Sequence, residues 1–376
     1  MRSSGIPLRA ADRSALGLWL ATRVSVVLIG VVGAWYATPA GQAHPLGLGR
    51  WFHWDAALLA EIAEFGYNGN PREPADPGLP AFFPGFPLLL RAVAVPLGGD
   101  YVLGGLLISL VAGGVAAVAL ARLGELEGAR VGPYAVAALL FSPMAVFLFA
   151  GYSEALFLAF ALPAWLLARR GRWGYAALAA AGASCVRITG LFLALALIVE
   201  FLMAWRARQP GAEPRALLVL AVPFVPLLAY SIYQFGRTGD LLAWNTAQQL
   251  GWGRHLVWPW ESAATTWEAA FETGDQFAGA FRTELIAGAV GVVLTLWLAI
   301  SGRWSEFVYV GLQVGALVTS SYYLSIPRST VLWFPLWLLV GRMAARHRWG
   351  AIWYFALSIP LMAIFALGFT RGQWTG

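Results

Sequence analysis

Two carboxylic acids and two arginines of this chain stand beside strongly apolar stretches. Asp55 lies in RWFHWDAALLAEIAEFGYNGN, Glu154 in GYSEALF, Arg187 in CVRITG and Arg328 in SIPRST. A charged side chain costs about 2.5–3.5 kcal/mol at the centre of a membrane helix on insertion scales, so each of these needs a partner or a task. We therefore expect these four residues to belong to the functional site.

The two carboxylates have structural as well as functional interpretations. Asp55 precedes a helical pattern and could be a helix N-cap, a role that does not exclude catalysis. Glu154 follows Ser153, a possible N-cap, and would then lie in a first helical turn, where the helix dipole favours negative charge. Spacing alone leaves both alternatives open for Asp55 and favours the structural one for Glu154.

The two arginines are harder to explain as surface charges. Arg187 is too far from the cytoplasmic side to reach it and would either pair with Glu154 or Glu200 or bind an anion. Arg328 could anchor the outer membrane interface, but its planar guanidinium also suits a phosphate. We favour anion binding for Arg187 and leave both roles open for Arg328.

The composition identifies a membrane protein that positions these residues. The chain is 59% hydrophobic and 12% charged and contains 19 Trp and 22 Phe, which excludes an ordinary soluble domain. Apolar stretches of about 20 residues recur from Leu16 to Phe369, so we expect one membrane-embedded domain over residues 1–376.

Several other functional classes are excluded or lack support. The net charge of +6 comes from short arginine clusters beside apolar stretches and not from one basic face, so no nucleic-acid partner is expected. Cys185 is the single cysteine, which excludes an internal disulfide. Walker, H-E-x-x-H and Cys/His zinc motifs are missing, so we expect no cofactor and assign no metal ligands.

The hydropathy pattern predicts an all-α polytopic protein with about 10 or 11 transmembrane helices. Arg2, Arg9 and Arg13 put the amino terminus in the cytoplasm by the positive-inside rule. At 1.5 Å per residue, residues 172–204 are roughly 48 Å long, so we expect two short helices that meet near Arg187. The predicted spans are 14–36, 101–121, 131–150, 153–169, 172–184, 187–204, 215–235, 283–301, 305–325, 329–345 and 349–369.

Two long, less hydrophobic segments, 37–100 and 236–282, fall on the outer side. After Asp55 the pattern predicts an amphipathic helix in the interface. The prolines of segment 79–96 forbid a regular span, so a re-entrant or surface-lying segment is expected there. The tryptophans of 236–282 suit a loop that rests at the membrane interface. Asp55, Glu154, Arg187 and Arg328 should then meet at the outer face.

With these residues in view, the chain resembles the PIG-V mannosyltransferases and looks like a bacterial member of that family, whose eukaryotic relatives add the second mannose during GPI-anchor synthesis. The matching stretches occur in the family's order. They are RWFHWDAALLAEIAEFGY, AFFPGFPLLLRAVAVPLG, FSPMAVFLFAGYSEALF, CVRITGLFLAL and SIPRSTVLWFPLWL. The sequence departs from many relatives at His53, where they have arginine, and at Ala56 and Ala57, where a more polar run is frequent.

The resemblance implies a GT-C-like fold and an inverting sugar transfer on the extracytoplasmic face of the plasma membrane. The donor would be a polyprenyl-phosphate mannose and the acceptor a glycolipid or lipid-linked glycan. Asp55 would be the general base. Arg187 and Arg328 would bind the donor phosphate. Substrate-binding positions carried over from the family motifs are His53, Trp54, Tyr152 and Glu154.

Two other classes of function compete with this one. A secondary transporter or lipid flippase would also have broken helices and buried charges, but such proteins tend to show two matching halves and a site near the bilayer centre. A noncatalytic subunit on the same fold is the other alternative, since a fold does not determine function.

Overall fold

The structure is a computed structural model that describes residues 9–37, 47–274 and 276–375, so Arg2 of the charge argument lies outside the described residues. Helices account for all regular elements in these ranges except one isolated bridge between Leu256 and Ser320. The all-α class is therefore confirmed. The helices of the bundle are α1 (Ala10–Ala37), α4 (Tyr101–Glu127), α5 (Val131–Leu140), α6 (Ser153–Ala168), α7 (Trp173–Val186), α8 (Thr189–Arg206), α9 (Pro214–Val219), α10 (Val225–Thr238), α13 (Ala278–Ile300), α14 (Trp304–Val318), α16 (Phe334–Arg346) and α17 (Arg348–Thr370).

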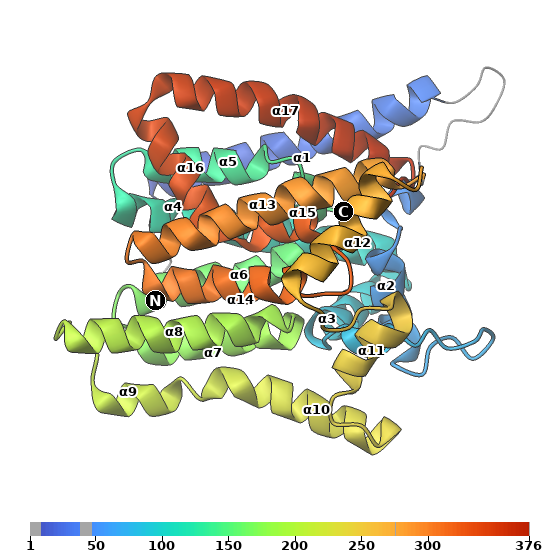
Figure 1. Ribbon diagram of the computed structural model, residues 1–376, viewed down its shortest axis with the longest axis horizontal. Coiled ribbons are helices and arrows are strands. Elements are labelled where there is room, and N and C mark those ends of the chain that lie inside the picture. The colour runs from blue at the N-terminus through green and yellow to red at the C-terminus, as the bar shows by residue number, and fades with distance from the viewer. Residues whose placement is uncertain (1–8, 38–46, 275, 376) are drawn as a thin grey trace.

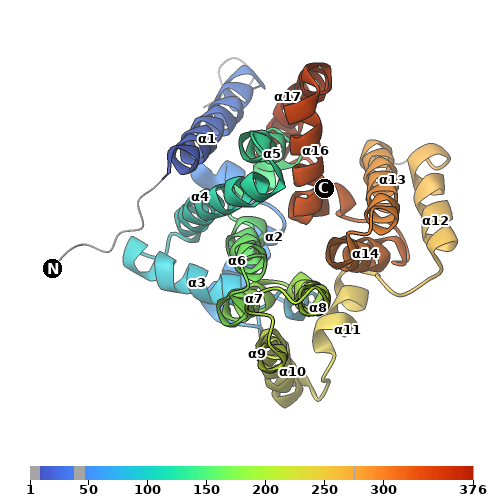
Figure 2. The ribbon, with the colours of Figure 1, turned by 90° about the vertical axis from the view of Figure 1, so that its left-hand side faces the viewer.

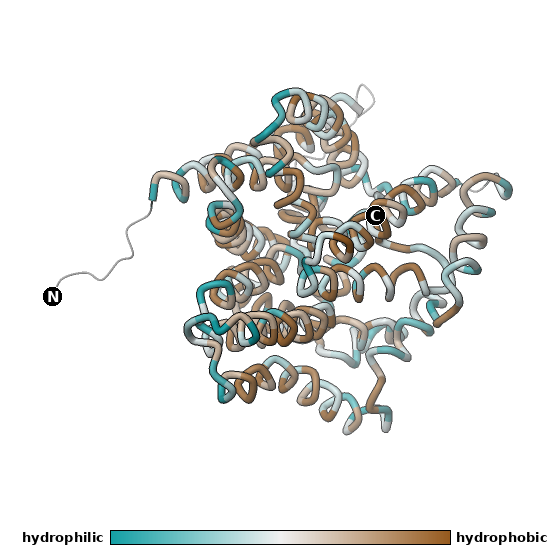
Figure 3. The backbone as a smooth tube through the Cα atoms, turned by 60° about the vertical axis from the view of Figure 1, so that its left-hand side comes forward, coloured by the Kyte–Doolittle hydropathy of each residue, from teal (hydrophilic) through white to brown (hydrophobic). Residues whose placement is uncertain are grey.

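These helices run side by side along one direction, and α6 lies near the middle of the bundle with α4 and α7 packed against it (Figures 1 and 2). Among the described residues, six segments are long and apolar enough to cross a membrane, and several shorter apolar helices accompany them. Hydrophilic residues concentrate at helix ends and connections (Figure 3). The chain is thus a multi-pass membrane protein, as its composition indicates.

The predicted break near Arg187 is confirmed. Helix α7 ends at Val186 and α8 begins at Thr189, with Arg187 in an extended conformation between them. Gly190 permits the two helices to approach closely at this point, because a Cβ atom there would lie 2.4 Å from the backbone of Ser184. The break thus holds the Arg187 backbone between two closely packed helix ends.

Three predicted spans are shorter than expected. Helix α5 ends at Leu140 instead of 150, since Pro143 follows and the chain continues as a 3-10 turn, Ala145–Leu148. Helix α14 ends at Val318 and α16 begins only at Phe334. Between them lies a short helix, α15 (Ile326–Ser329), which carries Arg328.

The two long segments predicted to lie on the outer side contain several helices. Helix α2 (Asp55–Phe65) forms where predicted, and α3 (Gly85–Ala94) is a ten-residue helix, consistent with the prediction that prolines prevent a span. Segment 236–282 forms α11 (Ala243–Trp252) and α12 (Pro259–Phe271). Trp258, Trp260 and Trp267 are exposed, as an interfacial segment requires, but α11 lines a cavity and is not simply a surface loop.

Ion pairs join the helix ends and connections that the arginine pattern predicts to lie on one side of the membrane. The Arg122 and Asp12 side chains lie 2.7 Å apart. Glu127 bonds both Arg303 and Arg342 at 2.9 Å. These pairs tie α1, α4, α16 and the connection between α13 and α14 together at the end of the bundle opposite α2 and α15 (Figure 1). The assignment of this end to the cytoplasm stays a prediction.

Arg23 of α1 has a structural role that the sequence analysis did not identify. Its guanidinium is buried, donates to the Ala145 carbonyl oxygen at 2.8 Å and lies over the Trp19 ring. That carbonyl belongs to the irregular chain after α5, where intrahelical bonds are lost. Arg23 thereby satisfies backbone acceptors that would otherwise be unpaired in an apolar interior.

Candidate active site

The four charged residues singled out in the sequence form one connected cluster. Arg328 lies between the two carboxylates, 2.6 Å from Asp55 through Nη1 and 2.6 Å from Glu154 through Nε. Burial lowers the pKa of Arg328, but the Asp55 and Glu154 carboxylates outweigh burial and raise it above its ordinary value. Arg328 is therefore a permanently charged link between α2, α6 and α15.

Arg187 completes the cluster. Its Nη1 donates to Glu154 at 2.8 Å and to the Ser153 hydroxyl at 2.7 Å. The ion pair with Glu154 thus forms as the structural alternative predicts, whereas Glu200 contacts Arg169 and Ser305 instead. Arg187 also lines the cavity described below, so the pairing does not remove it from a possible ligand.

The N-cap interpretations of Asp55 and Ser153 are wrong. Trp54 and Tyr152 hold the N-cap positions of α2 and α6, and neither makes a side-chain capping bond. Asp55 is the first helical residue, and its carboxylate pairs with Arg328 instead of the backbone. Glu154 does lie in a first turn, as predicted.

Unusual backbone conformations occur next to both ends of the Asp55–Arg328 pair. Trp54 has φ 54° and ψ −123°, and Ser325, which precedes α15, has φ 62°. Non-glycine residues with positive φ are uncommon and cost of order 1–3 kcal/mol in sparsely populated regions. Such strain persists where the surrounding structure imposes it, and it concentrates at functional sites.

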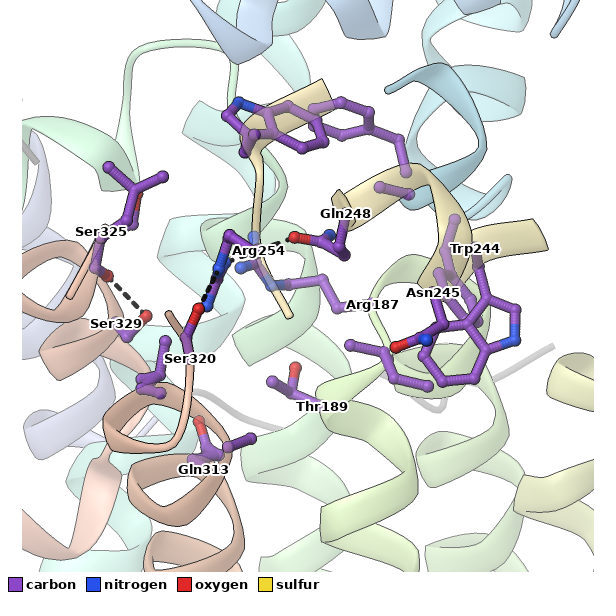
Figure 4. Close-up of a pocket in the computed structure, with 18 of the residues that line it drawn as sticks. Arg187, Thr189, Trp244, Asn245, Gln248, Arg254, Gln313, Ser320, Ser325 and Ser329 are labelled. Carbon is purple, nitrogen blue, oxygen red and sulfur yellow. Dashed lines mark hydrogen bonds between the residues drawn. The ribbon is translucent and has the colours of Figure 1, made fainter. Parts of the chain in front are cut away.

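A cavity of about 580 Å³ opens beside the cluster, within the size range of small-molecule sites. Asp55, Ser153, Arg187 and Arg328 contribute to its wall. Further contributions come from α11, the chain after it, and α14 with the residues that follow it. Among them are Trp244, Asn245, Gln248, Trp252, Arg254, Gln313, Leu317 and Ser320. Figure 4 shows Arg187 and Arg254 entering the same pocket from different segments.

The cavity wall contains buried polar atoms without partners in the described chain. They are the Thr189 hydroxyl oxygen, the Gln313 amide oxygen and the Trp244 indole nitrogen. Buried polar groups are normally hydrogen-bonded, so unpaired ones around a cavity indicate groups that a ligand or water would bond. Polar and aromatic side chains together suit a sugar-containing ligand with an apolar part.

The remaining predicted site residues, His53, Trp54, Tyr152 and Glu154, are not part of the cavity wall. Tyr152 is buried, donates to the His53 carbonyl oxygen at 2.8 Å and places its ring against the Arg328 guanidinium. The His53 ring packs on Phe369, and burial lowers its pKa. Trp54 packs edge to face on Trp374, which does line the cavity. Substrate binding by His53, Trp54, Tyr152 and Glu154 stays a prediction.

Arg254 and the polar face of α11 were missed by the sequence analysis. Asn245, Gln248 and Gln249 follow the i, i+3, i+4 spacing that places side chains on one helix face. That spacing indicates a helix with a polar face, whereas the tryptophans of the segment favour a loop at the membrane interface. Arg254 follows the helix and gives no motif of its own.

The described residues offer no metal centre of the usual kind. Across 9–37, 47–274 and 276–375, no three His, Cys, Asp or Glu side chains gather as ligands would. Asp55 and Glu154 both direct their carboxylates to arginine.

Fold and site thus define a polytopic helical membrane protein with a charged cavity at one end of its bundle. Comparison with known families adds a particular resemblance. Residues 42–207 match the family described as Mannosyltransferase (PIG-V). This region includes Asp55, Glu154 and Arg187 but ends before Arg254 and Arg328. The resemblance stated from the sequence motifs is confirmed for this region.

Individual proteins are similar over different parts of the chain. GPI alpha-1,6-mannosyltransferase 2 of Homo sapiens is 41% identical over 155 residues, which cover 38% of this chain and 30% of that protein. The crystal structure of the Archaeoglobus fulgidus oligosaccharyltransferase in the apo form has a TM-score of 0.44 and 12% identity, covering 95% of this chain and 56% of that one. The chain thus spans less than two thirds of either protein.

Proposed function

We propose that the protein is a glycosyltransferase that transfers mannose from a polyprenyl phosphate to a glycolipid or lipid-linked glycan on the extracytoplasmic face of a membrane. The observation that carries this proposal is the position of Asp55. It belongs to the region similar to the mannosyltransferases, and it lines a cavity next to an arginine cluster. The GT-C-like architecture and the plasma-membrane location belong to the same proposal.

In the proposed reaction, an acceptor hydroxyl oxygen attacks the anomeric carbon of the donor sugar. The bond between that carbon and the phosphate oxygen breaks, and its electron pair leaves with the phosphate. Asp55 accepts the hydroxyl proton as general base. Because attack and departure occur on opposite faces of the carbon, its configuration inverts. A phosphate that already carries negative charge needs no second carboxylic acid, unlike the leaving groups of glycosidases.

The cluster explains how Asp55 would be oriented. Arg328 contacts the Asp55 carboxylate directly, and Glu154 holds Arg328 from its other side. The assignment of Arg187 and Arg328 to the donor phosphate stays an untested prediction. Both arginines carry carboxylate partners, and the partner of Arg328 is the proposed base itself.

The experiment is incubation of the purified protein with polyprenyl-phosphate mannose and candidate lipid acceptors, followed by mass analysis of the lipids. An acceptor heavier by one hexose is expected. A transporter or flippase would instead move lipid between leaflets without changing its mass. A noncatalytic subunit would do neither, and either result would contradict the proposal.

The Asp55→Asn variant tests the general base. An amide cannot accept the proton, so sugar transfer should slow by about 10²–10⁴-fold. Glu64→Gln is the matched control, because it makes the same change on an exposed position of the same helix. Its turnover should be normal. Thermal unfolding of both variants is measured alongside, since Asp55→Asn also removes a partner of Arg328. A folded Asp55→Asn protein with normal turnover would end the catalytic assignment.

A further inference from the structure

Arg254 is a cavity arginine that has no carboxylate partner among the described residues. Its Nε donates to the Ser320 hydroxyl at 3.0 Å and its Nη1 to the Gln248 amide oxygen at 3.3 Å. Both acceptors are neutral, so they position the guanidinium without compensating its charge. Figure 4 shows both bonds at the edge of the pocket. A charge held this way at a partly buried site indicates an anionic ligand.

The other charges of the cavity wall are already balanced. Arg187 and Arg328 share the two carboxylates of Asp55 and Glu154, so this cluster is neutral as a whole. Glu284 is the further acidic residue whose charge acts on Arg254, but its oxygens accept the backbone N–H groups of Ser325 and Ile326. Among the charged side chains of the described residues that line this cavity, Arg254 is therefore the arginine without a carboxylate in contact.

The direction of the proposed reaction distinguishes Arg254 from Arg328. Inversion requires the base and the leaving phosphate on opposite faces of the anomeric carbon. Arg328 touches Asp55 at 2.6 Å, so it stands on the side from which the acceptor attacks. Arg254 comes from a different segment, the chain after α11, and bonds Gln248 and Ser320 instead of Asp55. The proposal requires that a phosphate next to Arg254 lie across the sugar from Asp55.

We propose that Arg254 binds the phosphate of the lipid-linked sugar donor, an inference that rests on the proposed function and adds a residue to it. The guanidinium stabilises the negative charge that the phosphate gains as the glycosidic bond breaks. Gln313, which is 2% exposed and has an unbonded amide oxygen, and Thr189 line the same cavity and offer further polar contacts.

The test measures binding and does not depend on turnover. The purified full chain is titrated with a polyprenyl monophosphate and, separately, with the uncharged polyprenol of the same length. Arg254→Gln should raise the Kd for the phosphate about 10- to 100-fold, the usual range for a charge-assisted hydrogen bond, and leave polyprenol binding unchanged. Arg254→Lys keeps the charge and should recover most of the affinity.

Arg237→Gln is the matched control, because this arginine belongs to α10, bonds Gln234 and Asn68 and lies outside the cavity wall. Its affinity for the phosphate should equal that of the unaltered protein. A phosphorylated acceptor glycolipid is titrated as well, and its affinity should not depend on Arg254. Thermal unfolding should be similar for all variants.

The outcomes separate the two proposals. If the unaltered protein does not prefer the polyprenyl phosphate to the polyprenol, the proposed donor is wrong. If it does prefer the phosphate and Arg254→Gln keeps that preference, the assignment of Arg254 is wrong while the donor stands. A loss of affinity only for the phosphorylated acceptor would also overturn the assignment, because Arg254 would then hold the other substrate.

Discussion

Glu154 is the residue on which the charged cluster depends most, because one of its oxygens bonds both arginines. The residue is fully buried. Glu154→Gln would leave Arg187 and Arg328 with a single carboxylate between them. Breaking a buried ion pair from one side costs about 3–5 kcal/mol, since it leaves uncompensated buried charge. We expect this loss in the free energy of unfolding, measured by denaturant titration in detergent.

The control for this prediction is Glu125→Gln. Glu125 pairs with Arg9 at 3.5 Å on the exposed end of α4, where an ion pair contributes about 0–1 kcal/mol. A Glu154→Gln protein as stable as the Glu125→Gln protein would mean that the cluster contributes little to the fold. The charged residues would then have a role in ligand binding and not in folding stability.

At this scale the sequence predicts which residues meet, but among their pairings it offers only that of Arg187 with Glu154, and only as one alternative. Asp55, Glu154, Arg187 and Arg328 are conspicuous because charge beside apolar sequence is costly, and the arrangement of spans brings them to one end. The choice of partners depends on side-chain positions that only the packed bundle determines. Arg23 shows the same limit, since its partners are backbone carbonyl groups freed where α5 ends.

The close approach of α7 and α8 makes Gly190 a position that is sensitive to substitution. A methyl group at residue 190 would meet the Ser184 backbone, which cannot move aside as a flexible side chain can. Overpacking of this kind costs about 1–3 kcal/mol. Gly190→Ala should lower the Tm. By separating the two helices it should also displace Arg187, which lies between them.

Gly174→Ala is the comparison, because it makes the same change in α7 with nothing within 4 Å of the added carbon. Its Tm should not fall, since alanine favours helix over glycine. Equal effects of the two substitutions would show that the break tolerates a wider spacing than the structure has.

Helices were predictable where length and hydropathy constrain them together. The break in residues 172–204 follows from a stretch too long for one span, and the structure has it at Arg187. Helix α11 was not predicted, because the sequence pattern of a short amphipathic helix in a tryptophan-rich segment resembles that of an interfacial loop. The early end of α5 had a signal in Pro143, but the apolar residues beyond it extended the hydropathy pattern.

For the whole molecule, the prediction is the sidedness of its two ends. In a protein with Cys185 replaced by serine, a cysteine at exposed Arg170 should react with an impermeant maleimide only from the cytoplasmic side. A cysteine at exposed Glu268 should react only from the other side. The reason is that arginines beside short connections stay in the cytoplasm. Vesicles of both orientations provide the measurement, and reversed labelling would contradict the proposed extracytoplasmic site.

The distribution of the cluster along the chain has a consequence for biosynthesis. Asp55, Glu154 and Arg187 are all translated before α15, which carries Arg328. A ribosome-bound chain can form the Glu154–Arg187 pair early, but Asp55 has no arginine until the last quarter of the protein is made. The site is therefore completed late during membrane insertion. A chain released before Ile326 would have the carboxylates and the early helices but not the arginine that joins them.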